Sequence, residues 1–142
     1  MIKRDEKMTD VEDDGQIRKF ESGATRDTAD DKYDPEGFLS PLVIDRFCEY
    51  MHKNRLQSDN SLRDSDNWQN GFGYPTLMKS TWRHFLDMWK IHRGLRATRR
   101  EKGKTVPVVM EEALCGLMFN VMGYLHEMLT EKVGQKADWV KK

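Results

Sequence analysis

Three stretches of the chain repeat apolar residues at the spacing of three or four that is typical of one buried helical face. The first runs through "PLVIDRFCEYMHKNR" from Pro41, after a Ser40 that suits a helix N-cap. The second covers about residues 77–92, and we expect Gly94 to follow its C-terminus. The third begins near Pro107 and continues through "EEALCGLMFNVMGYLHEMLTEK". Since no stretch shows a convincing strand pattern, we predict an all-α fold, a small bundle of three main helices with long ordered loops.

The segments outside these helices are polar. Residues 1–19 are mostly charged, and such a segment buries too little apolar surface to offset the entropy lost on ordering, so we expect a disordered or frayed tail. The helical domain is predicted to span residues 20–131, with a second tail over residues 132–142. Residues 56–76 are rich in turn formers but too long for a simple connector, which favours a functional loop. Residues 94–106 are predicted to form a mobile basic loop.

Composition narrows the class of protein. The 142 residues include 24 Lys or Arg and 24 Asp or Glu, so no overall field favours nucleic acid, which we do not expect as a partner. Cys48 and Cys115 lack metal-ligand spacing and are expected to be buried thiols of a reducing compartment. No apolar run suits a membrane span or a secretory signal, so we expect a soluble cytoplasmic protein without a membrane partner. The broad apolar helix faces favour a homo-oligomer.

The second predicted helix carries ionisable residues at the border of its apolar stripe. His84 and Asp87 are three residues apart and therefore share a helix face. In one interpretation, Arg83 and Asp87 form an ordinary surface pair and His84 is half-buried. In the other, His84 and Asp87 face a cleft, where His84 acts as a metal ligand or a general base. Arg83, with Lys79 and Arg93, would then bind phosphates.

The third predicted helix adds two carboxylates and a buried amide. Glu111 and Glu112 open its first turn, where the helix dipole favours negative charge. Glu112 also lies near the start of the Gly116 face, so we expect it to join the carboxylate and imidazole of the second helix around a cation. Asn120 must bond a neighbouring helix or a ligand, because an unpaired buried amide costs about 1–3 kcal/mol.

A loop tryptophan and the donor chemistry complete the candidate site. Trp68, after Asn67, either stacks on a nucleobase or packs in the core. Arg26 lies in "SGATRD", whose backbone N–H groups also suit an anion. Carboxylates with one imidazole suit Mg²⁺ or Mn²⁺ held together with phosphates.

Several of these segments resemble a known family. "SGATRD", "KYDPEGFLSPLV", "DSDNW", "RHFLDMWKIHRG" and "EEALCGLMFNVMGYLHE" are similar to phage and bacterial dATP/dGTP diphosphohydrolase-like proteins, relatives of the MazG-like all-α nucleotide pyrophosphohydrolases. The resemblance runs from about Phe20 to Glu127. It implies a helical dimer or tetramer, in the bacterial host's cytoplasm if phage-encoded. It also implies Mg²⁺- or Mn²⁺-dependent cleavage of nucleoside triphosphates, purine dNTPs in this case, between the α and β phosphates to give monophosphate and pyrophosphate.

The resemblance and the charges together define the predicted site. The predicted catalytic residues are His84, Asp87 and Glu112, and the predicted metal ligands are these three and Glu111. The predicted substrate-binding residues are Lys79, Arg83, Arg93, Asn120, Asn67, Trp68 and Arg26. MazG-like enzymes carry Glu-x-x-Glu on one helix and Glu-x-x-Asp on the next, whereas this chain has His84-x-x-Asp87 and no Glu-x-x-Asp. The alternative hypothesis is therefore a catalytically inactive helical protein that binds a nucleotide or a protein partner.

Overall fold

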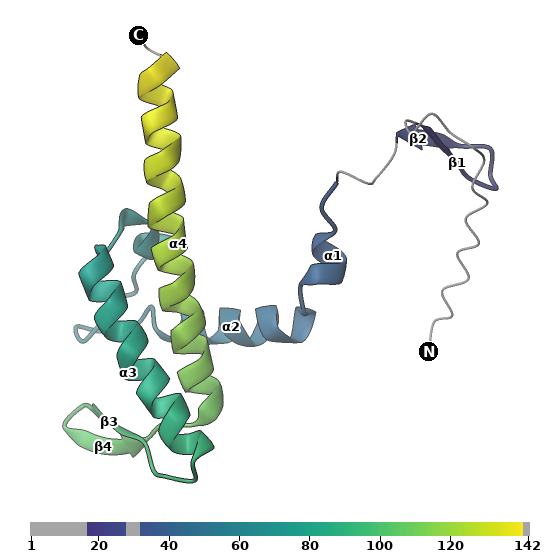
Figure 1. The fold of residues 1–142 in the computed structure, drawn as a ribbon. Coiled ribbons are helices and arrows are strands. Elements are labelled where there is room, and N and C mark those ends of the chain that lie inside the picture. The colour runs from purple at the N-terminus through teal and green to yellow at the C-terminus, as the bar shows by residue number, and fades with distance from the viewer. Residues whose placement is uncertain (1–16, 28–31, 141–142) are drawn as a thin grey trace. The chain divides into compact units, whose positions relative to one another are not determined.

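The chain divides into two units, Met1–Ser40 and Pro41–Lys142. A computed structural model describes residues 17–27 and 32–140, without the side chains of residues 133–140 (Figure 1). In the first unit, strands β1 (Ile17–Lys19) and β2 (Thr25–Asp27) pair antiparallel, and a short helix α1 (Pro35–Phe38) follows. Of the segment predicted to be a disordered tail, residues 1–16 lie outside the described residues.

Helices dominate the second unit. The prediction of a mostly helical chain is confirmed, and the start predicted at Pro41 is correct. Gly94 follows the second long helix with a φ of 76°, as expected of the glycine after a helix end. The third long helix continues to Val140, through most of the predicted C-terminal tail, because that segment holds no proline and only one glycine. The helices are α2 (Pro41–Lys53), the 3-10 helix η1 (Asn67–Asn70), α3 (Tyr74–His92) and α4 (Met110–Val140).

Two β-hairpins make the all-α prediction too narrow. In the second unit, strands β3 (Thr98–Glu101) and β4 (Lys104–Pro107) pair antiparallel where a mobile basic loop was predicted. The turn residues Lys102 and Gly103 have φ values of 49° and 76°, and two consecutive positive φ values suit the tight turn of a hairpin. The side chain of Arg100 donates a hydrogen bond of 2.9 Å to the carbonyl of Gly103 and fastens this turn. The only sequence signal for this hairpin is its two-residue turn, Lys102 and Gly103. The many basic residues around the turn favoured the interpretation as a loop.

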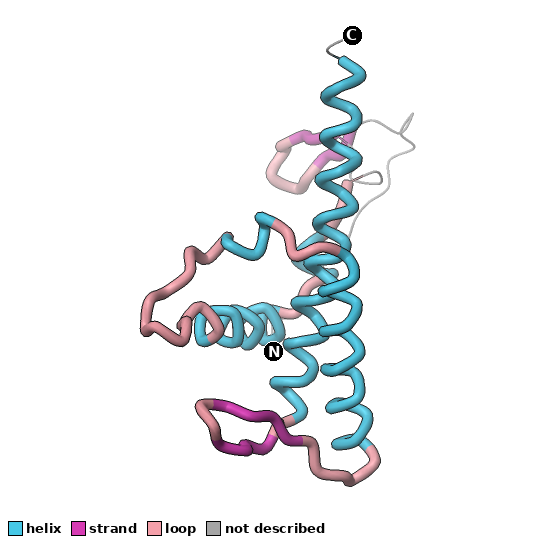
Figure 2. The backbone as a smooth tube through the Cα atoms, turned by 90° about the vertical axis from the view of Figure 1, so that its left-hand side faces the viewer, coloured by secondary structure: helices cyan, strands magenta, loops and turns pink. Residues whose placement is uncertain are grey.

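Helices α3 and α4 lie side by side along most of α3 (Figure 2). Leu77, only 1% exposed, lies against Gly123, and His84 lies against Gly116. Contacts that advance by seven residues along α3 and retreat by seven along α4 show that the two helices run antiparallel. Near the C-terminal end of α3 and the N-terminal end of α4, the buried residues Ala97, Val108 and Ala113 form a small apolar cluster. Met88 and Ile91 of α3 pack against this cluster.

Helix α2 covers one side of α4. Phe47 and Tyr50 of α2 form a buried cluster with Cys115 of α4. Met51, Phe119 and Met122 pack around this cluster. Among the described residues, no helix combines the length and the apolar character that crossing a membrane requires.

Candidate functional site

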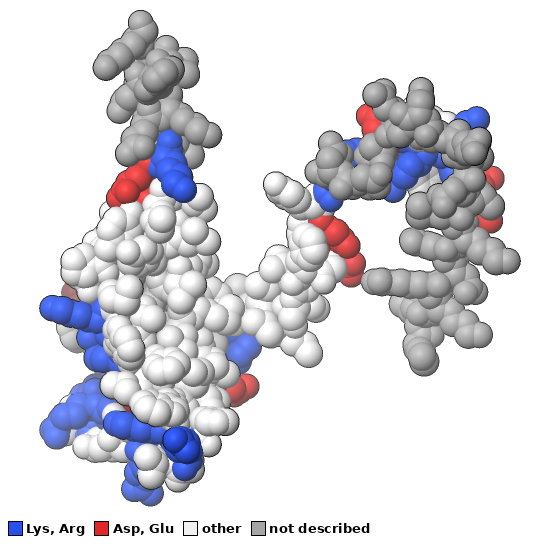
Figure 3. Space-filling view, in the orientation of Figure 1, with Lys and Arg blue, Asp and Glu red and all other residues white. Residues whose placement is uncertain are grey.

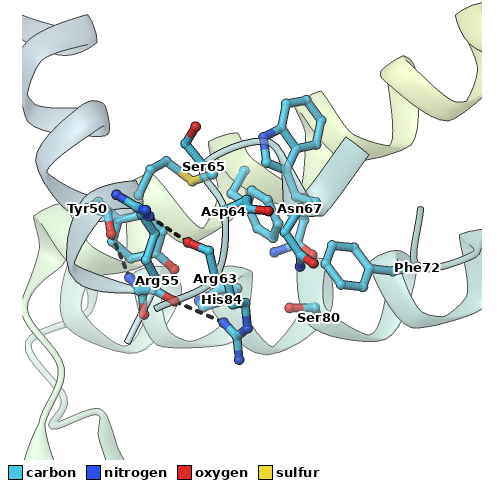
Figure 4. A pocket seen from close by; sticks show the side chains of 14 residues that line it. Tyr50, Arg55, Arg63, Asp64, Ser65, Asn67, Phe72, Ser80 and His84 are labelled. Carbon is cyan, nitrogen blue, oxygen red and sulfur yellow. Dashed lines mark hydrogen bonds between the residues drawn. The ribbon is translucent and has the colours of Figure 1, made fainter. Parts of the chain in front are cut away.

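A pocket of about 250 Å³ opens between α2, the loop that follows it, η1, α3 and α4 (Figure 4). Four of the residues predicted from the sequence line this pocket, although they come from three separate segments of the chain. They are Asn67 and Trp68 of η1, His84 of α3 and Asn120 of α4. The structure therefore brings together part of the predicted substrate-binding set and one predicted catalytic residue.

Aromatic rings form one wall of the pocket. Trp68 meets the rings of His126 and Phe119 edge-on, with centroid distances of 4.9 and 6.2 Å. Phe72 also meets Phe119 edge-on, at 6.2 Å. Trp68 thus packs against α4 and also faces the pocket, so the two interpretations of this residue are compatible. A wall of this kind offers an apolar surface to a flat ring.

Two arginines that the sequence analysis missed lie on the opposite wall. Arg55 donates from Nε to the carbonyl of Arg63 at 2.7 Å, and Arg63 donates from Nη1 to the carbonyl of Asn54 at 2.9 Å. These bonds close the turn-rich segment between them, where Leu56 and Leu62 form an isolated β-bridge. A guanidinium has five N–H donors, so each arginine keeps donors for an anion. Their position at the two ends of "LQSDNSL" was the available sequence signal.

His84 is half-buried where the pocket meets α4. Burial lowers the pKa of its imidazole; the charge of Asp87 opposes this shift, and those of Arg83 and Arg99 reinforce it. The imidazole is therefore neutral near pH 7 and able to accept a proton. His84 is half-buried, as the structural interpretation required. It also lines a pocket, but Asp87, which the functional interpretation placed beside it in the cleft, lies outside the pocket lining.

Asn120 is the most buried polar side chain of the site, with 2% of its surface exposed. Its Nδ2 donates to the carbonyl of Gly116 in its own helix at 2.7 Å, rather than to a neighbouring helix. One amide N–H is used in this way, so the other N–H and the carboxamide oxygen remain for a ligand. Asn120 also lines the pocket, which favours the ligand interpretation.

Glu112 lies outside the pocket lining, among three cations. Its Oε1 is 3.5 Å from Nη2 of Arg46 and 3.4 Å from Nζ of Lys53, and its Oε2 is 3.9 Å from Nη1 of Arg99. The side chain is only 13% exposed, and Oε2 is buried without a hydrogen-bond partner among the described residues. Arg46 and Lys53 are seven residues apart on α2, so one helix face supplies both. The seven-residue spacing of Arg46 and Lys53 is visible in the sequence, but the sequence does not show that both pair with Glu112.

The predicted metal ligands do not form one group. Among the residues that the structure describes, no three His, Cys, Asp or Glu side chains gather so as to hold a metal ion. Glu111 is 71% exposed in its side chain and pairs with Arg46 at 3.8 Å. Oε2 of Glu112 accepts no hydrogen bond among the described residues but already lies 3.9 Å from Nη1 of Arg99. The predicted set of His84, Asp87, Glu111 and Glu112 does not fit a metal ion as arranged. The metal site stays a prediction.

The remaining predicted residues lie away from the pocket lining. Lys79 and Arg83 are exposed on α3, although the charge of Arg83 acts on His84. The exposed Arg93 follows the last residue of α3, and its backbone N–H donates to the carbonyls of Trp89 and Lys90. Arg26 belongs to β2 in the other unit of the chain.

The chain was compared with models of protein families, with curated proteins and with solved structures, and nothing in these three sets matches it. The functional argument therefore rests on the pocket and its residues. The pocket unites an aromatic wall, a neutral imidazole, a buried amide and two arginines. This combination suits a ligand that has both a flat ring and anionic groups.

Proposed function

We propose that this protein binds a nucleoside triphosphate, with purine deoxynucleotides as the favoured substrates, and hydrolyses it between the α and β phosphates. The observation that carries the proposal is that Asn67, Trp68, His84 and Asn120 line one pocket. An aromatic ring can stack on a base, an amide can recognise its edge, and arginines can bind phosphates. The sequence resemblance is the support for the reaction, and the residues that line the pocket are the support for nucleotide binding there.

The size of the pocket constrains how the nucleotide binds. Its volume of about 250 Å³ is slightly below the range of about 300–1,000 Å³ for pockets that enclose a whole drug-sized ligand. We therefore place the nucleoside inside, against Trp68 and Asn120, and the phosphates at the open rim near Arg55 and Arg63.

The residues of the pocket suit hydrolysis of a phosphoanhydride. The neutral imidazole of His84 can take a proton from an attacking water molecule. Arg55 and Arg63 would offset the negative charge that grows on the departing pyrophosphate. The described residues form no group of three His, Cys, Asp or Glu side chains that could hold a metal ion. Mg²⁺ or Mn²⁺ is therefore expected from the resemblance alone, and it is added as a component of the assay below.

The alternative function is nucleotide binding without hydrolysis. It is favoured by Glu112, whose carboxylate is held by Arg46, Lys53 and Arg99 instead of joining other acidic residues. An inactive protein of this kind would use the same pocket. The two functions differ in whether bound nucleotide is turned over.

Product analysis distinguishes these functions. The purified full chain is incubated with each common ribonucleoside and deoxynucleoside triphosphate, with Mg²⁺ or Mn²⁺, and the products are separated by anion exchange. Monophosphate with pyrophosphate supports the proposal, whereas diphosphate with phosphate rejects the cleavage position. Saturable binding without product supports the alternative. Absence of both binding and product rejects the pocket as a nucleotide site.

A tryptophan pair tests the pocket itself. Replacing Trp68→Ala removes a stacking surface worth about 1–3 kcal/mol per base, so we expect nucleotide affinity to fall about fivefold to 150-fold. The control is Trp89→Ala on the exposed face of α3, which does not line the pocket. Equal affinities of the two variants would show that the base does not bind against Trp68.

A further inference from the structure

Lys and Arg side chains gather at one end of the second unit. Residues 90–104 include seven Lys or Arg and a single carboxylate, that of Glu101. Figure 3 shows this gathering where Figure 1 places the β3–β4 hairpin and the end of α3. The equal totals of basic and acidic residues therefore conceal an uneven distribution. We call these seven residues the basic cluster, which consists of Lys90, Arg93, Arg96, Arg99, Arg100, Lys102 and Lys104.

Six of the seven cations are available to an external anion. Among the residues that the structure describes, only Arg99 of the basic cluster forms an ion pair, with Glu101 and with Glu112, at 3.9 Å in both cases. The other six members of the cluster are all exposed. Since the pair with Arg99 already compensates the charge of Glu101, six uncompensated positive charges face the solvent and attract a polyanion.

The hairpin is a fixed ribbon rather than a mobile loop. Ala97 and Val108, directly before and after the two strands, are 2% and 9% exposed, and the backbone N–H of Val108 donates to the carbonyl of Ala97 at 2.9 Å. These two residues anchor the base of the ribbon in the small apolar cluster described above. At the tip, the bond from Arg100 to the carbonyl of Gly103 fastens the turn. A ribbon held at both ends loses little conformational entropy when it binds a ligand.

The two sides of the ribbon differ. Arg99 lies opposite Val106 in the strand register, and both are half-buried. This side faces the helices, since Arg99 pairs with Glu112 of α4. The next pair, Arg100 and Thr105, is exposed on the other side, because successive strand residues alternate. The outer side of the ribbon therefore presents a guanidinium and a hydroxyl, groups that bind phosphate oxygens and base edges.

We propose that the basic cluster binds double-stranded DNA, with the tip of the β3–β4 hairpin in the major groove. The major groove of B-DNA is about 12 Å wide and admits a two-stranded β-ribbon. Strands of four residues reach about 13 Å, enough to enter this groove. Lys102 lies at the tip, while Arg93 and Arg96 precede the base of the ribbon, on the side of the flanking phosphates. The local charge thus replaces the expectation, drawn from the total charge, that nucleic acid is not a partner.

Other polyanions fit the ribbon less well. Proteins that hold single strands stack the bases on aromatic side chains, and residues 93–107 contain no Phe, Tyr or Trp. The major groove of A-form RNA is too deep and narrow for side chains to read. Segments that bind anionic membranes insert apolar side chains beside their cations, whereas the turn at the tip is Lys102 and Gly103. The shape and the composition of the ribbon therefore favour duplex DNA.

Fluorescence anisotropy of a labelled DNA duplex of about 20 base pairs, two turns of helix, tests this interface with the full chain. We expect saturable binding at about 50 mM salt, with a log–log salt slope between about −3 and −5, because each phosphate contact contributes about −0.9. Lys102→Gln/Lys104→Gln should make the slope shallower by about 2 and weaken binding about tenfold. The matched control Lys79→Gln/Lys132→Gln loses the same charge at exposed positions at the other end of the helix pair, and it should bind like the wild type.

Four results would overturn the proposal. They are no binding to the duplex at low salt, an equal loss of binding in the control variant, tighter binding to single-stranded DNA or to duplex RNA of the same sequence, and hairpin-dependent binding to anionic phospholipid vesicles but not to DNA. If the hairpin variant loses its native circular dichroism, Arg93→Gln/Arg96→Gln, outside the strands, replaces it, with the same loss expected. The inference does not depend on the proposed function, since no member of the basic cluster lines the pocket. Nucleotide affinity should therefore be unchanged in the hairpin variant.

Discussion

The imidazole of His84 lies directly against Gly116, and this contact sets how closely α3 approaches α4 beside the pocket. A Cβ atom at position 116 would lie 2.5 Å from Cε1 and 2.7 Å from Cγ of His84, closer than non-bonded atoms pack. The imidazole ring can occupy this position only because residue 116 has no side chain. The same contact holds His84 at the pocket while Asn120 bonds the carbonyl of Gly116 from the next turn.

Replacing Gly116→Ala should destabilise the protein and move His84. Alanine gains about 1 kcal/mol of helix propensity over glycine, but forcing a methyl group into a packed contact costs about 1–3 kcal/mol. Because the whole ring must move, we expect a net loss of about 1–2 kcal/mol, measured by urea unfolding. Gly123→Ala is the control, since its Cβ would lie 3.3 Å from Cδ2 of Leu77, which yields more easily. Equal stability of the two variants would contradict a special role for the His84 contact.

Acidification should weaken the fold through His84. Burial lowers the pKa of its imidazole in the folded state, whereas the unfolded chain has the ordinary value of about 6.5. As pH falls below that value, the unfolded state binds the proton first, so stability is lost until the folded-state pKa is passed. We expect the urea midpoint of the wild type to fall more between about pH 7 and pH 5 than that of His84→Gln. An equal fall would exclude His84 as the cause. His92→Gln, at an exposed position, serves as the control.

Neutralising Glu112 should lower the free energy of unfolding, because its carboxylate pairs with two cations of α2. The variant Glu112→Gln leaves Arg46, Lys53 and Arg99 without their shared carboxylate. Removal of one partner from a fully buried pair costs about 3–5 kcal/mol, but these cations are partly exposed, so we expect a loss of about 1–2 kcal/mol of unfolding free energy. Glu111→Gln, which removes a single exposed pair, should change stability by less than about 0.5 kcal/mol. If both variants behave alike, the three cations do not stabilise the fold through Glu112.

A variant at Asp87 distinguishes nucleotide hydrolysis from nucleotide binding without hydrolysis. It lies outside the pocket lining, and its negative charge raises the pKa of His84 against the effect of burial. If hydrolysis requires Asp87 as a metal ligand or beside His84, Asp87→Asn should abolish turnover and leave nucleotide affinity within about threefold. Full turnover in this variant would remove Asp87 from the mechanism, and a parallel loss of affinity would place its effect in binding.

Helix periodicity predicted the long helices because apolar residues such as Met78, Trp82 and Phe85 recur every three or four positions over several turns. The hairpin with its turn at Lys102 and Gly103 was not predicted, because a two-residue turn gives almost no periodic pattern in the sequence. For the site, His84 and Asn120 stood out as polar residues within apolar stripes, and both line the pocket. The pocket arginines were not predicted, because their position at the two ends of a turn segment does not show that the folded loop brings Arg55 and Arg63 beside α3 and α4. Nor did the position of Glu112 reveal its three cations, which come from α2 and β3.

Glu127 should control the shape of the pocket without contacting the nucleotide. Its Oε1 accepts hydrogen bonds from the backbone N–H groups of Phe72 and Gly73 at 2.7 and 3.2 Å, which fastens the end of the loop that carries Trp68. Charge-assisted bonds of this kind contribute about 1.5–3 kcal/mol, and part of that loss should appear as about three- to tenfold weaker nucleotide binding in Glu127→Ala. Hydrogen exchange should quicken at residues 68–73 while global stability changes little. Glu131→Gln, one turn later on α4 beside Tyr74, should alter neither quantity. Faster exchange with unchanged affinity in Glu127→Ala would show that nucleotide binding does not need the fastened loop and would place the ligand away from Trp68 and Phe72.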